Sequence, residues 1–445
     1  MDASGTGGAR AGLSGPQMME TNMKRRKFIK LGTLALAATA QGCVSAATAP
    51  GKLSMAGAFD REMEAFMEAR KVPGGALAVV KDRRLVYARG YGWADREKKI
   101  PVRPASLFRI ASVSKPITAV AVLKLIEEGR LSLDTRALPL LGLTPLIASF
   151  RDPEPRLRKI TVRQLLQHTG GWDRDKSFDP MFRPEQIAQA AHSPSPATAE
   201  QIIRHMLSMP LAFDPGARHA YSNFGYCVLG RVIEKVTGEP YEKFVREKIL
   251  APAGITRMSI GASLDGKQAP GEVRYYTSDD ATAKNVFPNG PEKVPWPYGG
   301  FHLEAMDAHG GWIASAVDLA RFAAALDEPS RSPLLKPETF STMYAPPPAP
   351  VSRKSDGSLE ASYYGCGWSV RPVGKNGKAN YWHTGSLPGT NTLLVRRWDG
   401  LSWAALFNQR SEDKKLPDDA IDPALHRAAA AVGEWPREDF FASFK

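Results

Sequence analysis

The alternation of apolar and polar residues predicts a helix and then a hairpin near the beginning of the chain. Residues 55–70 place their large apolar side chains on one helical face, namely Phe59, Met63, Phe66 and Met67. The Pro- and Gly-containing stretch 72–75 ends this helix. Two apolar runs follow at 76–80 and 85–87, and the polar pair Lys81-Asp82 between them predicts a β-hairpin.

The opposite end of the chain shows strand patterns and one helix. Its apolar segments are Tyr381-Trp382, residues 392–395 and residues 403–407, with a turn at Asp399-Gly400 and an Ala-rich helix over 423–432. Strands at both ends and helices between them imply an α/β fold, in which both termini complete one antiparallel sheet flanked by helices.

Between these ends we predict a largely helical insertion over about residues 116–300. Two segments, 115–128 and 224–233, are apolar on almost every side, which is typical of buried helices. By contrast, residues 261–300 are rich in Gly, Pro and Asp and lack periodicity, which predicts a long loop over the active site. We expect this loop to set the substrate preference. Residues 43–435 are predicted to form one catalytic domain.

The first 42 residues are predicted to be an export signal with a disordered extension. Arg25-Arg26 precede an apolar run of about ten residues, which is typical of a twin-arginine signal and shorter than the roughly 20 residues that span a bilayer. Cys43 stands where a lipoprotein signal is cleaved, while residues 44–47 offer an ordinary small-residue cleavage site. Two outcomes stay open for the exported protein: membrane attachment through a lipid on Cys43, or release into the periplasm.

Composition excludes some partners. The formal net charge is +13, but no stripe of Lys and Arg is interleaved with aromatic residues, so nucleic-acid binding is not expected. Apart from Cys43, the cysteines are Cys227 and Cys366. Two are too few for a disulfide framework, and their apolar or Gly-rich surroundings predict buried thiols. No His, Cys or Asp cluster has ligand spacing, so neither a metal nor an organic cofactor is expected.

The first candidate motif is Ser112 with Lys115, at the start of the buried helix 115–128. Residues three apart share a helical face, and a lysine buried among apolar groups can have its pKa lowered enough to accept the serine proton. The simpler alternative is that Ser112 only caps the helix and Lys115 is solvated. The same spacing recurs at Ser411 and Lys414, where a polar stretch follows and would leave the lysine exposed.

Two further motifs follow in order along the chain. Tyr221-Ser222-Asn223 begins the second apolar helix, although an ordinary helix start in a core-facing position would also explain it. His383-Thr384-Gly385-Ser386 lies between two predicted strands. A second His-Thr-Gly begins at His168, where a glycine stop after a helix explains the sequence.

This ordered set of motifs resembles the penicillin-recognising serine hydrolases, which include class C β-lactamases, D-alanyl-D-alanine carboxypeptidases and esterases that share their fold. The resemblance implies a β-lactamase/transpeptidase-like fold and an acyl-enzyme on Ser112. It also implies that Lys115 and Tyr221 carry protons and that Asn223 binds Lys115 or the substrate carbonyl. The backbone N–H groups of Ser112 and Ser386 would form the oxyanion hole.

The resemblance further implies that the third motif lies on an edge strand beside the nucleophile. There His383 and Gly385 would contact substrate, with Gly385 keeping the strand open to it. Most β-lactamases of this group have lysine where this chain has His383, and histidine is mostly uncharged near neutral pH. A carboxylesterase is therefore favoured, with a D-alanyl-D-alanine carboxypeptidase or a β-lactamase as alternatives. In each case the partner is a small ester or peptide. A catalytically weak peptidoglycan-binding module is the remaining alternative.

Overall fold

The computed structural model describes residues 54–146, 154–374, 377–412 and 415–444. The predicted export signal, Cys43 and Lys414 lie outside these residues. Within them, no helix combines the length and the apolar content that crossing a membrane requires.

An antiparallel sheet forms the centre of the described structure, in the order β3-β2-β1-β13-β12-β11-β10-β9. Its strands are β1 (Gly74–Lys81), β2 (Arg84–Asp95), β3 (Ile100–Pro101), β9 (Tyr363–Tyr364), β10 (Ser369–Val373), β11 (Lys378–Leu387), β12 (Thr390–Arg396) and β13 (Leu401–Phe407). Strand β1 pairs with β13 along its length, from Gly75 opposite Phe407 to Lys81 opposite Leu401. Segments from the two ends of the chain therefore meet inside one sheet, which confirms the predicted fold class.

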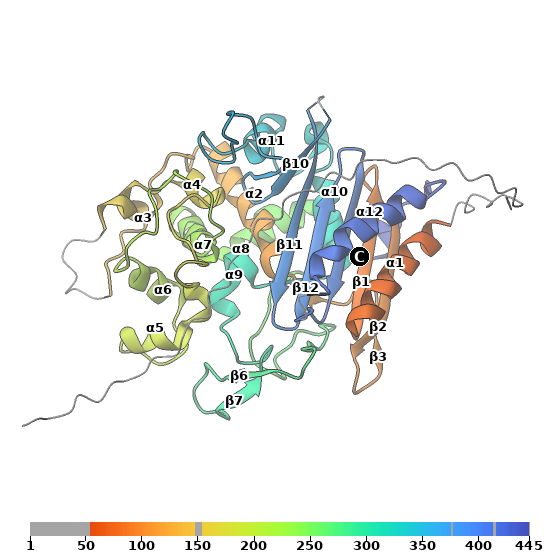
Figure 1. Ribbon diagram of the computed structural model, residues 1–445, viewed down its shortest axis with the longest axis horizontal. Helices are drawn as coiled ribbons and strands as arrows, with labels where there is room; N and C mark the ends of the chain where they lie inside the picture. Colours follow the sequence, from red (N-terminus) through yellow and green to blue (C-terminus); the bar gives the residue numbers. More distant parts are fainter. Residues whose placement is uncertain (1–53, 147–153, 375–376, 413–414, 445) are drawn as a thin grey trace, which may run out of the picture. The chain divides into compact units, whose positions relative to one another are not determined.

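Alternating side chains of the central strands enter two different cores. Leu77 and Val79 of β1 face a core shared with α1 (Met55–Arg70) and α12 (Ile421–Ala431), which lie side by side on the sheet (Figure 1). Ala76 and Ala78 face the larger core on the other side. Because both faces are covered, these strands are apolar throughout, and each large buried side chain contributes about 1.5–3 kcal/mol.

The first hairpin turns at Asp82 and Arg83, one residue later than the sequence suggested. Both residues have positive φ, 48° and 67°, and Lys81 pairs with Arg84 across the turn. Two consecutive left-handed residues match the right-handed twist of the strands that they join.

Helices form most of the larger core, on the face of the sheet opposite α1 and α12. Helix α2 (Ser114–Glu127) is buried on nearly every side, as predicted, and it packs against α7 (Asn223–Thr237). The other α-helices of this part are α3 (Ala137–Leu141), α4 (Val162–Leu166), α5 (Pro184–Ala190), α6 (Ala199–Met206), α8 (Tyr241–Val245), α9 (Asp307–Gly310), α10 (Ala316–Ala325) and α11 (Pro337–Tyr344). Beside them, β4 (Phe108–Arg109), β8 (Trp312–Ala314) and β5 (Ser259–Ile260) form a small antiparallel sheet.

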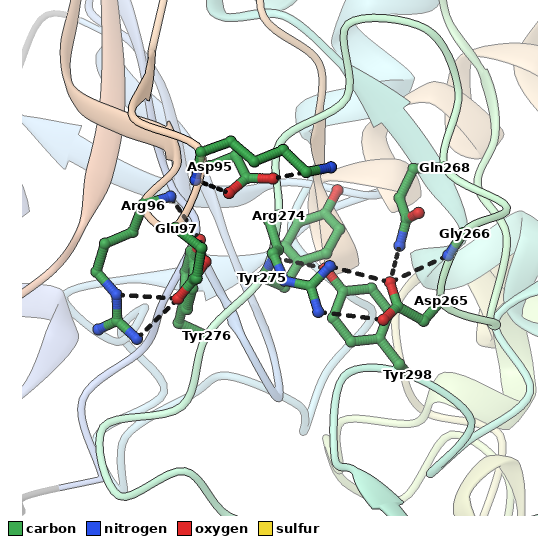
Figure 2. A network of polar contacts seen from close by, with 11 residues as sticks. Asp95, Arg96, Glu97, Asp265, Gly266, Gln268, Arg274, Tyr275, Tyr276 and Tyr298 are labelled. Atoms are coloured by element: carbon green, nitrogen blue, oxygen red, sulfur yellow. Dashed lines mark hydrogen bonds and ion pairs between the residues drawn. The ribbon is translucent and has the colours of Figure 1, made fainter.

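The segment 261–300 is more ordered than the predicted structureless loop. It contains the hairpin of β6 (Thr282–Lys284) and β7 (Lys293–Pro295). A polar network joins it to the end of β2 (Figure 2): the Tyr276 hydroxyl donates to Glu97 and accepts from the backbone N–H of Arg96, at 2.7 Å each. Arg274 binds Asp265 within the segment through both carboxylate oxygens.

Candidate active site

Ser112 lies in a single 3₁₀ turn, η1 (Ala111–Val113), that leads into α2. The preceding residue, Ala111, is buried and has φ 47°, in the left-handed region that costs an alanine about 1–2 kcal/mol. The Thr392 hydroxyl donates to the Ile110 carbonyl at 2.9 Å and so ties this turn to β12. The sheet and the buried helix together hold a strained turn at the candidate nucleophile.

The Lys115 side chain is fully buried, and its Nζ has three hydrogen-bond partners. They are the Ser112 hydroxyl at 2.9 Å, the Asn223 Oδ1 at 2.8 Å and the His309 carbonyl at 2.9 Å. Burial, assisted by the positive charge of Arg174, lowers the pKa of Lys115 well below its usual range. A neutral amine has two N–H donors for the amide oxygen and the carbonyl, which can only accept. Its lone pair then faces the Ser112 hydroxyl, which can donate.

Tyr221 and Asn223 approach this lysine from the start of α7. The phenol of Tyr221 hydrogen-bonds with Ser112, and Nζ of Lys115 lies 4.8 Å from the centre of the Tyr221 ring. Burial raises the pKa of Tyr221, so its phenol holds its proton at neutral pH. The helix start is fixed locally, because the Ser222 side chain accepts from the N–H of Gly225 at 3.1 Å.

His383 of β11 is buried and electrically neutral. Its Nδ1 donates to the Thr384 carbonyl at 2.7 Å, which leaves Nε2 to accept from the Tyr364 hydroxyl at 2.9 Å. Burial, together with the nearby Lys115, lowers the pKa of His383 to about 3. This side chain carries no fixed positive charge near neutral pH.

The third motif was expected on an edge strand, and β11 is an edge strand only in its second half, where the motif lies. Residues Lys378 to Trp382 pair with β10 on one side, while β12 pairs on the other. The β10 ladder stops opposite Trp382, so the stretch from His383 to Leu387 has β12 as its ladder partner in the described structure. The motif lies at a partial edge, since β10 is shorter than β11.

Gly385 has a steric role that the sequence did not reveal. A Cβ at this position would lie 2.4 Å from the Ile110 carbonyl and 2.2 Å from the Thr392 hydroxyl. Backbone cannot yield at such distances, so the contact with the nucleophile turn demands glycine, apart from any contact with substrate.

The strand register points the Ser386 N–H away from β12. Leu387 and Thr390 close a two-residue hairpin and therefore form a hydrogen-bonded pair. Ser386 opposite Asn391 is consequently a non-hydrogen-bonded pair, and its N–H faces the free side of β11. This is the direction that an oxyanion-hole donor requires.

A pocket of about 530 Å³ opens above these groups. Of the predicted site residues, it brings together Ser112, Tyr221, Asn223, His383 and Ser386, while Lys115 lies buried beneath Ser112. Its lining also includes side chains that the sequence reasoning missed, namely Arg174, Phe182, His219, His309, Tyr364 and Arg410. These residues belong to no motif, and only the packing of distant segments brings them to the site.

Two predictions about the surroundings of this pocket need correction. No residue of 261–300 is in its lining, so the prediction that this segment covers the site is wrong. Arg109 holds the segment in place, because its guanidinium donates to the carbonyls of Pro297 and Ala262, and Trp296 of the segment packs against the pocket-lining Arg410. His168, expected to mark only a helix end, packs its ring 4.3 Å from that of Tyr221 and accepts from the N–H of Ser222.

Two expectations about other groups can be compared with the structure. Cys227 and Cys366 are both buried free thiols, as predicted, and burial raises the pKa of each to about 12. Among the described residues, no three His, Cys, Asp or Glu side chains are grouped so that they could hold a metal ion.

The family model described as Beta-lactamase matches residues 59–428. A Dichelobacter nodosus protein named "Putative fimbrial assembly protein FimD, serogroup D" is 31% identical over 68% of this chain and 66% of its own length, so this chain spans just under two thirds of that relative. Esterase EstB of Burkholderia gladioli is 29% identical over 71% of this chain and 78% of its own. The octameric penicillin-binding protein homologue from Pyrococcus abyssi superposes with a TM-score of 0.63 at 25% identity, covering 83% of this chain and 77% of that chain.

Proposed function

The chain belongs to the Beta-lactamase family and is a serine hydrolase, and on that premise we propose that it cleaves carboxylic esters through an acyl-enzyme on Ser112. Amide bonds of small peptides are the second substrate class.

The proposed acylation starts with the neutral amine of Lys115. Its lone pair takes the proton of Ser112 while Oγ attacks the ester carbonyl carbon, and the carbonyl π electrons move onto oxygen. The backbone N–H groups of Ser112 and Ser386 stabilise this oxyanion. As the tetrahedral intermediate collapses, the bond to the leaving alcohol breaks, and Tyr221 donates its proton to that oxygen. The protonated Lys115, whose Nζ lies 4.8 Å from the centre of the Tyr221 ring, then returns its proton to the Tyr221 phenolate, which restores both residues.

Deacylation follows the reverse path with water in place of the alcohol. Water gives a proton to the Lys115–Tyr221 pair as its oxygen attacks the acyl carbon. The bond to Ser112 Oγ then breaks, Oγ recovers the proton, and the carboxylic acid leaves. Lysine and tyrosine suit these roles because burial shifts their pKa values in opposite directions, which leaves a neutral amine beside a protonated phenol.

One observation carries the preference for esters: His383 is neutral, and both of its ring nitrogens are already hydrogen-bonded. A substrate carboxylate therefore finds no cation at the position where related β-lactamases have lysine. A neutral ester does not need a cation at this position.

A second candidate is a peptidase for D-alanyl peptides, with β-lactams third. The guanidinium groups of Arg174 and Arg410 line the pocket and could bind a terminal carboxylate. Arg410 is already paired with Glu412 at 2.6 Å, which lowers its value for that purpose. A catalytically weak binding module is the least favoured alternative, because the serine, lysine and tyrosine that catalysis requires are all present and in contact.

The test compares wild type with Ser112→Ala on p-nitrophenyl butyrate, a D-alanyl-D-alanine peptide and a chromogenic cephalosporin. We expect the highest kcat/KM on the ester and a loss of about a millionfold in kcat in Ser112→Ala, as for other serine hydrolases. Equal rates in the two proteins would rule out the nucleophile. A higher kcat/KM on the peptide would select the second candidate.

We also propose that the protein is exported, on the paired arginines at 25–26. Mass spectrometry of the mature amino terminus decides between the two processing routes. A lipid on Cys43 means attachment to a membrane, whereas a free terminus beyond residue 43 means release.

A further inference from the structure

Asp179 fixes which way the side-chain amide of Asn223 points. Its carboxylate, with the side chain 14% exposed, accepts a 2.6 Å hydrogen bond from Asn223 Nδ2. A carboxylate can only accept, so the NH₂ end of the amide must face Asp179. The oxygen end then faces Nζ of Lys115, at 2.8 Å.

This orientation decides how Lys115 meets Ser112. With Asn223 Oδ1 and the His309 carbonyl both accepting, the two N–H groups of a neutral lysine are occupied. Its lone pair can then point only toward Ser112. If the amide were reversed, its NH₂ group would face the amine, and the lone pair would turn toward that donor.

Arg174 lies five residues before Asp179 in the chain and carries the opposite charge. Its guanidinium lies 3.7 Å from Asp179 and 4.7 Å from the ring centre of Tyr221. Asp173 binds Arg218 at 2.6 Å, which anchors the segment to the stretch that leads into Tyr221. Two opposite charges are thus held beside the groups that move protons.

We propose that Asp179 and Arg174 are positioning residues for the acyl transfer. Asp179 orients the Asn223 amide, which in turn directs the Lys115 lone pair toward Ser112. Arg174 counteracts the effect of the Asp179 charge on the Lys115 amine. The inference rests on the proposed function for its chemistry. The two residues act on Lys115 with opposite sign, because Arg174 lowers the lysine pKa and Asp179 raises it. The titratable and charged groups that face Lys115 are Arg174, Asp179, His168, Tyr221, Tyr226, His309 and His383.

Charge variants test whether Asp179 and Arg174 act on Lys115 with opposite sign. Asp179→Asn keeps an oxygen that can accept from Asn223 but removes the charge, so the acid limb of the kcat/KM profile moves to lower pH. Arg174→Gln moves that limb to higher pH. Asp175→Asn is the matched control, because Asp175 also lies near Arg174, at 3.8 Å, yet is 90% exposed, and the carboxylate that binds Asn223 is that of Asp179. The kcat/KM profile of Asp175→Asn should match that of the wild type. Shifts of the same sign in Asp179→Asn and Arg174→Gln would overturn the proposal.

A double-mutant cycle tests whether Asp179 acts by orienting the Asn223 amide. Asp179→Ala lowers kcat/KM about ten- to hundredfold, the effect of losing a hydrogen bond to a charged group. In an Asn223→Ala background the same change has less than about a twofold effect, because the amide that it orients is absent. Equal effects in both backgrounds would show that Asp179 does not act through Asn223.

The rate at which a fluorophosphonate labels Ser112, measured against pH, repeats both tests without an ester. If the wild type is labelled but hydrolyses no ester, the proposed substrate class is wrong, and the labelling rates still decide the role of Asp179 and Arg174. If ester turnover is present and the variants leave both profiles unchanged, the positioning role is wrong and the hydrolase assignment stands.

Discussion

The hydroxyl of Tyr364 donates a 2.9 Å hydrogen bond to Nε2 of His383, and this contact completes the partners of a buried neutral imidazole. Strands β9 and β11 are separated by β10 in the sheet, so the bond connects two non-adjacent strands at the pocket. It explains how a histidine on the third motif is held without charge and without exposure to solvent.

Removing this hydroxyl should destabilise the protein. Tyr364→Phe leaves a buried ring nitrogen without its donor, and we expect the free energy of unfolding to fall by about 1–3 kcal/mol. Urea denaturation at neutral pH measures the change. The matched control is Tyr363→Phe, which removes a hydroxyl bonded to the Tyr344 carbonyl at 3.0 Å outside the pocket. If both variants hydrolyse ester at the wild-type rate, Tyr364 has no role at the site beyond stability.

Exchanging Lys115 for arginine should impair proton transfer, because it replaces the neutral amine of the proposed mechanism with a side chain that stays positively charged. A guanidinium does not lose its proton near neutral pH, so kcat should fall by about 10²–10⁴. Steady-state hydrolysis of p-nitrophenyl butyrate measures it. Lys124→Arg, on the same helix but 31% exposed, should retain wild-type kcat. Activity of Lys115→Arg within a factor of about three of wild type would exclude the lysine as the base.

A methyl group on Gly385 should disturb the nucleophile turn. The added Cβ would collide with the Ile110 carbonyl, so we expect Gly385→Ala to cost about 1–3 kcal/mol of stability and most of the activity. Thermal unfolding and ester hydrolysis are the measurements. Gly225→Ala is the control, because a Cβ there would have its nearest neighbours at 3.7 Å and would favour the helix. A fully active Gly385→Ala would mean that the turn can move without loss.

Stability should fall as the pH drops below 6.5. Burial lowers the pKa of His383 to about 3, so between these values the unfolded chain binds a proton that the folded chain does not. The free energy of unfolding should therefore lose about 1.4 kcal/mol from this one residue between pH 7.5 and 5.5. His168 and His309 act in the same direction, since burial lowers their pKa values too.

The variant His383→Gln isolates this contribution. Its drop in stability between the two pH values should be smaller than that of the wild type by about 1.4 kcal/mol. His192→Asn removes an exposed histidine and should leave the wild-type drop unchanged. An equal pH dependence in wild type and His383→Gln would show that this imidazole is not held neutral.

Local patterns gave good predictions wherever one face or one turn decides the outcome. The helix at 55–70 and the strands at both ends were predictable because a buried face repeats every 3.6 or every two residues. The contact between Ser112 and Lys115 was predictable for the same reason, because one helical turn separates them.

The predictions failed where they needed to know what a segment packs against. The lack of periodicity at 261–300 suggested a loop over the site, yet this segment packs against Arg109 and the end of β2. The edge position of β11 depends on the length of β10, a relation between strands that no pattern within β11 contains.

By itself, the sequence determined the fold class, the order of the motifs and the serine–lysine pair, because these follow from periodicity and from residues close together in the chain. Only the tertiary structure decided which distant side chains complete the site. Asp179 reaches Asn223, Tyr364 reaches His383, and Arg174 reaches Tyr221 through the packing of segments that carry no motif. The same packing shifted the ionisation of the site, because removal from water, which no local pattern specifies, lowers the pKa values of Lys115 and His383.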